Sequence, residues 1–215
     1  MREIVLDTET TGLDPAEGHR IVEIGCVELI DHLPTGVTFH RYLNPERPVP
    51  IESQRVHGLT DEFLADKALF AHIVDELDDF LGDAPLVIHN AAFDIKFLNA
   101  ERLRATRPSI PFARAIDTIE IAKAKIPGAR YSLDELCKRF GIDLSARTKH
   151  GALLDAELTA RVYLELVGGR QTRLKLAPRD VEVVAVSIAT TNVIRLRPRV
   201  LPPRLTEAET EAHRM

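Results

Sequence analysis

The sequence predicts an α/β protein in which helices flank a mixed central sheet and a C-terminal tail follows. Short apolar or alternating segments at 3–7, 20–30, 37–43 and 85–88 predict strands. Segments with apolar residues at helical spacing lie between and after them. Because predicted helices lie between and after the predicted strands, helices and strands are expected to pack as layers around a common core.

The first three predicted strands are expected to form an antiparallel sheet. Residues 3–7 are an apolar run that ends in an acid, and a Thr-Glu-Thr-Thr-Gly loop follows. Segments 20–30 and 37–43 alternate in part and are expected to join around Pro34 and Gly36, because proline and glycine favour turns. Residues 85–88 predict a short buried strand added later to the sheet.

The helices are predicted from apolar spacing and from their ends. Thr60 is expected to cap a short helix that begins at Asp61. Ser132 and Glu135 match a capping box, and Gly168 is expected to end the last helix. Residues 44–58 contain three prolines and predict a surface loop. The longer helices are predicted over 70–81, 92–104, 116–125, 132–140 and 151–167.

Composition limits the class of protein. Hydrophobic residues make up 45% of the 215 residues, enough for a substantial core, yet no apolar run approaches the roughly 18 residues of a membrane span. The N-terminus does not match a signal peptide. Cys26 and Cys137 lack partners at metal-ligand spacing and predict buried free thiols, which fits a reducing cytoplasm.

The charge argues against strong stand-alone binding to nucleic acid. The net charge is −5, whereas phosphate neutralisation by basic residues supplies most non-specific affinity. Aromatic residues are 5% of the chain and no basic stripe accompanies them, which disfavours a pure nucleic-acid-binding module. A metal site made of carboxylates stays compatible with this charge, because bound cations restore positive charge locally.

Acidic residues at three places predict a metal site. Asp7 and Glu9 project to the same face of a strand and repel each other unless a cation lies between them. Asp94 begins a helix, where the helix dipole alone would also favour an acid. Asp155 lies among leucines, where an unpartnered carboxylate is costly, and His150 precedes it. Each residue has an ordinary structural explanation by itself, but the set indicates Mg²⁺ or Mn²⁺ binding.

Three segments carry a resemblance to a known family. VLDTETTG, HNAAFD and HGALLDAE resemble the three exonuclease motifs of proofreading exonucleases, and the histidine stands five residues before the last aspartate. This places the chain, over about Glu3 to Gly169, with the histidine subtype of the four-carboxylate exonuclease family. Within that family it is most similar to the epsilon subunits of bacterial DNA polymerase III, as segments 56–63, 132–136 and 162–164 also indicate.

The resemblance implies a ribonuclease-H-like exonuclease fold over 1–169 and a metal-dependent 3′→5′ exonuclease that releases nucleoside 5′-monophosphates from DNA. It implies two divalent ions, Mg²⁺ or Mn²⁺, one held by Asp7, Glu9 and Asp155 and the other by Asp7 and Asp94. His150 is implied as the general base, since its ordinary pKa of about 6.5 suits that role. The implied substrate contacts are Asp7, Thr8, Glu9, Glu52, His57 and Asp155.

The resemblance also implies partners. Residues 170–215 would be an extended tail that binds the polymerase catalytic (alpha) subunit, and prolines in the tail would lower the entropy lost on docking. Gln171–Leu176 resembles a sliding-clamp-binding peptide. A tail without a partner is the alternative.

The expected substrate is the 3′ end of DNA. Because an acidic protein binds DNA weakly, the polymerase is expected to deliver this end to it.

Two other functions remain open from sequence alone. An RNA-trimming exonuclease would use the same metal chemistry, because neither the metals nor His150 require a particular sugar. A non-catalytic subunit that stabilises a polymerase is disfavoured, since such a protein would be expected to lack one of the five catalytic residues.

Overall fold

The computed structural model describes residues 1–145, 147 and 149–168. The predicted tail at 170–215, including the clamp-like peptide Gln171–Leu176, lies outside these residues, so the predicted domain boundary after Gly169 stays a prediction. Among the helices of the described part, none is long and apolar enough to cross a membrane.

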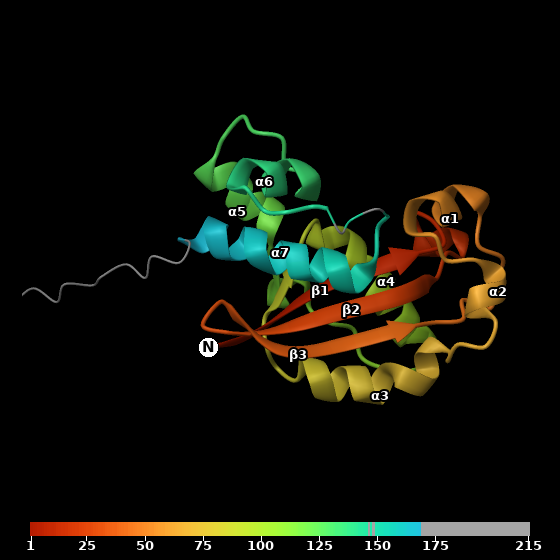
Figure 1. The fold of residues 1–215 in the computed structure, drawn as a ribbon. Helices are drawn as coiled ribbons and strands as arrows, with labels where there is room; N and C mark the ends of the chain where they lie inside the picture. The colour runs from red at the N-terminus through yellow and green to blue at the C-terminus, as the bar shows by residue number, and fades with distance from the viewer. Residues whose placement is uncertain (146, 148, 169–215) are drawn as a thin grey trace, which may run out of the picture. The chain divides into compact units, whose positions relative to one another are not determined.

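The centre of the fold is a five-stranded mixed sheet in the order β3-β2-β1-β4-β5 (Figure 1). Antiparallel pairing joins β1 to β2 and β2 to β3, whereas β1–β4 and β4–β5 are parallel. The long β1 is therefore central, and its C-terminal end carries Asp7 and Glu9. The strands are β1 Arg2–Thr10, β2 Ile21–Ile30, β3 Leu33–Tyr42, β4 Leu86–Ile88 and β5 Ala115–Asp117.

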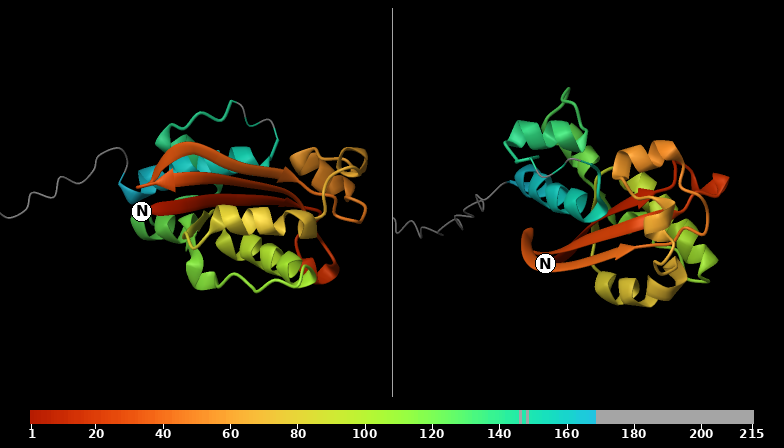
Figure 2. Two further views of the ribbon diagram at one scale, coloured as in Figure 1. Left: turned by 90° about the horizontal axis from the view of Figure 1, so that it is seen from below. Right: turned by 45° about the vertical axis from the view of Figure 1, so that its right-hand side comes forward.

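Helices cover both faces of the sheet. The helix α7 (Ala152–Val167) packs across β1 and β2 on one face, while α3 (Phe70–Leu81) and α4 (Ala91–Arg104) cover the other. Figure 2, left, shows the sheet between these two helical layers. The remaining helices are α1 Ile51–His57, α2 Asp61–Leu64, α5 Thr118–Lys125 and α6 Leu133–Phe140, with short 3-10 turns η1 Pro15–Glu17 and η2 Phe112–Arg114.

The alternation of β1 decides where its side chains go. Ile4 and Leu6 pack into the larger core against α3 and α4. Val5 packs into a second core with Ala156 and Ala160 of α7. Because successive strand residues point to opposite faces, Asp7 and Glu9 continue the face of Val5 and lie on the side of α7.

Most predicted elements are confirmed. The spacing over 70–81 gives α3 with the predicted ends, and the helices predicted over 92–104, 132–140 and 151–167 match α4, α6 and α7 to within a residue at each end. Thr60 accepts a hydrogen bond from the Phe63 amide, and Ser132 accepts one from the Glu135 amide, so both predicted N-caps are present. The predicted fold class is therefore correct.

Four local predictions were wrong. Residues 8–10, predicted to begin the loop after the first strand, continue β1 to Thr10 because they pair with β2. The β2–β3 connection is a two-residue turn at Asp31 and His32, both at positive φ, and not a loop around Pro34 and Gly36. Pro34 and Gly36 instead lie inside β3. Because β3 is an edge strand, the missing N–H of Pro34 costs little. Residues 51–57, predicted as loop, form α1, because the last proline precedes the helix and does not interrupt it. Residues 115–117, which include the start of the predicted helix 116–125, instead form β5.

Gly25 lets α7 approach the sheet. It lies on β2 opposite Asp7, and its backbone faces the start of α7. A Cβ at this position would lie 2.2 Å from the Leu153 amide nitrogen and 2.3 Å from the Ala152 carbonyl carbon. Since both contacts are to backbone, a side chain would push α7 away, and with it the acid in its first turn.

We expect Gly25→Ala to destabilise the fold by about 3 kcal/mol through overpacking. The matched control is Gly36→Ala, where a Cβ meets no atom within 4 Å but the backbone is at φ +88°. That control should cost about 1 kcal/mol from conformation alone. Urea denaturation of both variants measures the difference, and an equal cost at the two sites would contradict the packing account.

Candidate active site

Carboxylates gather on the α7 side of β1 and β2. In the antiparallel pairing, Asp7 stands opposite Gly25 and Glu9 opposite Glu23. Opposed residues share a face, with Cβ atoms about 5 Å apart, so Glu23 joins the two predicted acids. Glu23 is buried, and its Oε1 lies 2.7 Å from Nε2 of His40. Sequence reasoning missed Glu23, because only the strand register brings it to Glu9.

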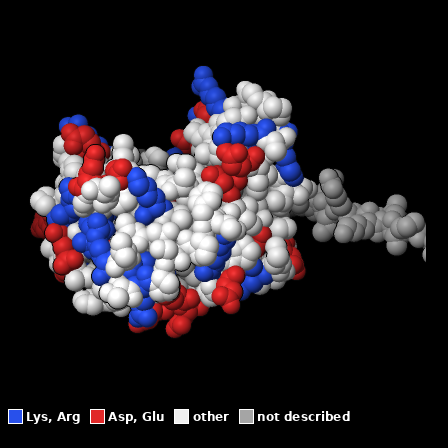
Figure 3. Space-filling view, turned by 180° about the vertical axis from the view of Figure 1, so that it is seen from behind, with Lys and Arg blue, Asp and Glu red and all other residues white. Residues whose placement is uncertain are grey.

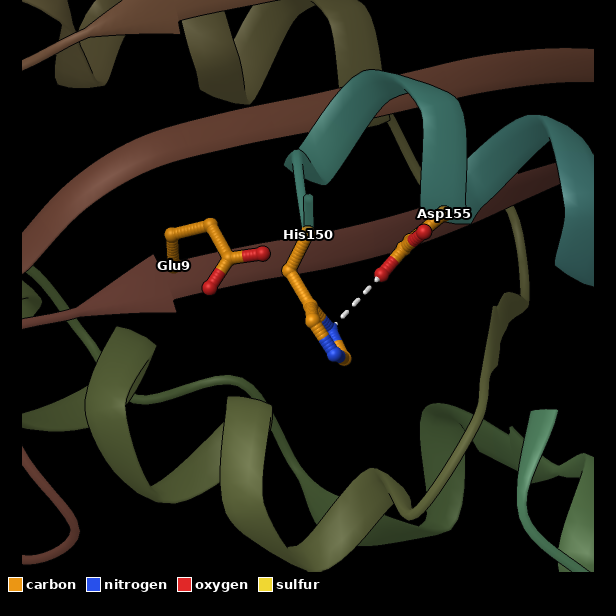
Figure 4. Close-up of side chains that lie close together, drawn as sticks. All are labelled: Glu9, His150 and Asp155. Carbon is orange, nitrogen blue, oxygen red and sulfur yellow. Dashed lines mark ion pairs between the residues drawn. The ribbon is translucent and has the colours of Figure 1, made fainter. Parts of the chain in front are cut away.

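The loop before α7 and its first turn bring His150 and Asp155 to the same place. Asp155 is buried, and its amide donates to the Gly151 carbonyl one turn earlier. His150 is half exposed, and its amide donates to the Val56 carbonyl of α1. Ligand atoms of Glu9, His150 and Asp155 all lie within 4.8 Å of one another, and Figure 4 shows the three side chains facing a common space.

Asp94 reaches the site from the other face of the sheet. It lies in the first turn of α4, is buried, and accepts a 2.7 Å hydrogen bond from the Thr8 hydroxyl. Asn90 precedes the helix in the left-handed conformation, and Asp117 accepts hydrogen bonds from the Asn90 and Ala91 amides. Asp94 and Asp7 are outside the 4.8 Å group, yet each carboxylate is close enough to contribute to the electrostatics of the cluster.

The acids repel one another strongly. Burial raises the pKa of Glu9 to about 8, and Asp155, Glu23 and Asp94 add to the rise. Burial also raises the pKa of Asp94 to about 7, against the lowering effect of the Thr8 hydrogen bond. The pKa of Asp7 lies well above its ordinary value, first because of burial and then because of Asp94 and Glu9. Near neutral pH the cluster therefore retains protons when no cation is bound.

Arg147 is the basic residue within this cluster, and the sequence pattern did not single it out. Its Nε and Nη2 donate to the two oxygens of Asp155, each at 2.7 Å. Its Nη1 donates to Asp134 of α6 at 2.5 Å, and its Nη2 lies 2.9 Å from Nδ1 of His150. The Arg147 side chain is 9% exposed, so it is an internal partner of the acids.

Residues at the C-terminal end of β1 line two cavities. The larger, about 480 Å³, is bordered by Asp7, Asp155, His150 and Arg147, with His89 and Asn90 on its wall. The smaller, about 170 Å³, lies beside Thr8 and Glu9. Its other lining residues are Thr10, Gly12, Leu13, Ser53, Val56, His57 and Phe93. Asp7 and Asp155 thus border the larger cavity, and Glu9 borders the smaller.

The predicted substrate residues divide between these spaces. Thr8, Glu9 and His57 line the smaller cavity, whereas Asp7 and Asp155 line the larger. His57 is buried, its Nδ1 accepts from the Leu59 amide, and its Nε2 finds no partner among the described residues. Glu52 is exposed on α1 and borders neither cavity, so the structure does not bring it to the other predicted residues.

The site suits divalent cations. Buried carboxylates with raised pKa values mark a place where positive charge would relieve repulsion, and carboxylate oxygens are the donors that Mg²⁺ and Mn²⁺ prefer. The imidazole of His150 lies in the same close group as the Glu9 and Asp155 carboxylates. The residues present therefore fit a divalent metal site.

The outer surface is not strongly basic on the face opposite Figure 1. Figure 3 shows basic and acidic side chains interspersed there, with uncharged surface between them. This distribution agrees with the net charge of −5 and with the prediction of a weak intrinsic grip on nucleic acid.

Comparison with known proteins places the chain in a family. A family model described as "Exonuclease" matches residues 4–163. Among solved structures, one of Exonuclease X in complex with 5′ overhanging duplex DNA has a TM-score of 0.60 and 28% identity, and the match covers 76% of this chain and 90% of that one. The chain belongs to the exonuclease family, and the predicted ribonuclease-H-like exonuclease fold is confirmed.

The curated relatives narrow this class. The DNA polymerase III subunit epsilon of Rickettsia felis is 53% identical over 185 residues, which cover 85% of this chain and 81% of the relative. The subunit epsilon of Escherichia coli K12 is 50% identical over 184 residues, which cover 82% of this chain and 75% of the relative. Within the exonucleases the chain thus groups with DNA polymerase III epsilon subunits, as predicted, and it is a 3′→5′ exonuclease of that type.

The raised pKa values predict how stability depends on pH without metal. Unfolded Glu and Asp have pKa values of about 4, whereas Glu9 and Asp94 titrate near 8 and 7 in the fold. Between these values the folded protein holds protons that the unfolded chain releases, so the free energy of unfolding decreases as pH rises and levels off above about pH 8.

We therefore expect the thermal midpoint in EDTA to fall by about 5 °C or more between pH 5.5 and 8.5. In the double variant E9Q/D94N the fall should be smaller, because the amides do not titrate and only the raised pKa of Asp7 remains. Calorimetry of both proteins checks this. An equal fall in the two would show that other groups cause the dependence.

Proposed function

We propose that Asp7, Glu9, Asp94, Asp155 and His150 form the catalytic centre that removes nucleotides from DNA 3′ ends. The observation that carries the proposal is their convergence at one end of β1. They come from β1 itself, the first turn of α4, the loop before α7 and the first turn of α7. The buried, mutually repelling acids have no ordinary structural purpose there, since burying them without cations is costly.

Asp7, Glu9 and Asp155 would hold one divalent cation, and Asp7 and Asp94 a second, with Mg²⁺ or Mn²⁺ as the candidates. When bound, such ions activate a water molecule and stabilise the departing 3′ oxygen. His150 is half exposed at the rim of the larger cavity, where it can accept a proton from water. Thr8 orients Asp94 through its hydroxyl.

The smaller cavity would receive the terminal nucleotide. Because Nδ1 of His57 accepts from the Leu59 amide, the ring hydrogen is on Nε2, and this N–H is a donor for a substrate oxygen. Phe93 borders the cavity while it also packs against Phe97, so it serves the core and can contact a base. Glu52 would contact substrate only if the nucleotide extends beyond this cavity.

The relatives' name supports a role within a polymerase assembly. An acidic protein binds DNA weakly by itself, and the face shown in Figure 3 carries interspersed charges and no basic stripe, so delivery of the 3′ end by a polymerase fits these electrostatics. The tail at 170–215 as the contact to the alpha subunit, Gln171–Leu176 as a clamp-binding peptide and a cytoplasmic location complete the proposal.

The test is digestion of a 3′-mismatched DNA primer by the full chain, with Mg²⁺, with Mn²⁺ and with EDTA. We expect wild-type protein to release nucleoside 5′-monophosphates only with metal, and Asp7→Ala to lose at least about three decades of turnover. An RNA oligomer of the same sequence forms a second arm. Equal activity of wild type and Asp7→Ala would refute the assignment of the site, and faster digestion of RNA would refute the DNA substrate.

His150→Ala belongs in the same assay as a separate arm. It should lower turnover by about two to four decades, the usual contribution of a general base, while the fold is kept because His150 is half exposed. His72→Ala, an exposed histidine on α3, is the matched control and should leave turnover unchanged.

A further inference from the structure

Arg147 occupies the position in the acidic cluster where a cation is expected. Its Nε and Nη2 donate hydrogen bonds to the two oxygens of Asp155. Asp155 also belongs to the close group with Glu9 and His150. Bidentate pairing of this kind is stronger and more directional than a single charged hydrogen bond.

The same guanidinium engages His150. Its Nη2 lies 2.9 Å from Nδ1 of His150 and 2.7 Å from Oδ2 of Asp155, so it bridges two members of the close group. Nδ1 of His150 also lies 3.2 Å from Oδ2 of Asp155, so the ring contacts both members of the Arg147–Asp155 pair. A guanidinium only donates, so in the tautomer in which Nδ1 accepts from Arg147 the ring hydrogen is on Nε2. In this arrangement neither ring nitrogen of His150 has a lone pair available for water.

We propose that Arg147 is the resident counter-ion of Asp155, which a divalent cation must displace before the site becomes active. Displacement frees both oxygens of Asp155 and the lone pair of His150 in one event. Metal binding and activation of the base are then coupled through a single side chain. This inference rests on the proposed function, because it takes Asp155 as a metal ligand.

Asp134 explains how Arg147 can leave Asp155 without leaving the site. The Nη1 bond to Asp134 anchors the guanidinium to the first turn of α6, and Asp134 borders the larger cavity with Arg147. A guanidinium released from Asp155 keeps this partner and stays beside the cavity. Its freed donors then face the space where the phosphate of a substrate would lie, and guanidinium binds phosphate well.

Mn²⁺ titration of the full chain, followed by the electron paramagnetic resonance of free Mn²⁺, tests the proposal. Arg147→Gln removes the competing cation, and Arg139→Gln, an exposed arginine on α6, is the control of equal charge change. If the Asp155 carboxylate is free of Arg147 in about a tenth of the metal-free protein, Arg147→Gln should lower the Mn²⁺ dissociation constant about tenfold. Arg139→Gln should match wild type.

A second readout is the thermal midpoint. In EDTA, Arg147→Gln should melt below both wild type and Arg139→Gln, because its acids have lost their counter-ion, and saturating Mn²⁺ should close that gap. A dissociation constant for Arg147→Gln equal to or above that of wild type would overturn the proposal, and a higher one would mean that Arg147 supports the metal-bound site. Asp155→Asn separates the two hypotheses: if it binds Mn²⁺ as wild type does, the proposed metal site itself has failed.

Discussion

Repulsion among buried carboxylates is the constraint on which the rest of this structure depends. Asp7, Glu9, Asp94 and Asp155 lie at one end of β1, and Glu23 stands across the strand from Glu9. Like charges in a low-dielectric site are costly, so the protein must protonate them, pair them or bind cations. Protonation is seen in the raised pKa values, and pairing in the bidentate contact from Arg147. Divalent ions, as proposed above, would be the third solution.

The topology of the sheet brings these acids together in spite of their repulsion. The alternation of β1 sends Ile4 and Leu6 into one core and Val5 into the other, so Asp7 and Glu9 must face α7. Gly25 then allows α7 close enough for its first turn to present Asp155. The rest of the protein stabilises an assembly of acids that would not form by itself, which is typical of sites built for electrostatic catalysis.

Much of this could be predicted from the sequence. Periodicity and capping residues located α3, α6 and α7, because those segments have strong local signals. The three motif segments identified the family before any contact was known. What local pattern could not supply was contact between distant residues. The three-residue β5 is defined by pairing with β4, and the turn at Asp31 and His32 by pairing of its flanking strands.

The same limit applies within the site. Glu23 is found only through its register with Glu9, and Arg147 only through its hydrogen bonds, since neither belongs to a periodic or motif pattern. Glu52, predicted by resemblance to contact substrate, is exposed and away from both cavities. The contact between Glu52 and substrate therefore stays a prediction from the resemblance alone.

The central claim is that these acids converge in order to hold divalent cations, and anomalous diffraction tests it most directly. Crystals grown with Mn²⁺ should give anomalous peaks at the C-terminal end of β1. One peak should lie about 2.1 Å from oxygens of Asp7, Glu9 and Asp155, and Asp94 should be beside a second. Peaks only elsewhere on the protein, with Arg147 still bound to Asp155 at saturating Mn²⁺, would contradict the account.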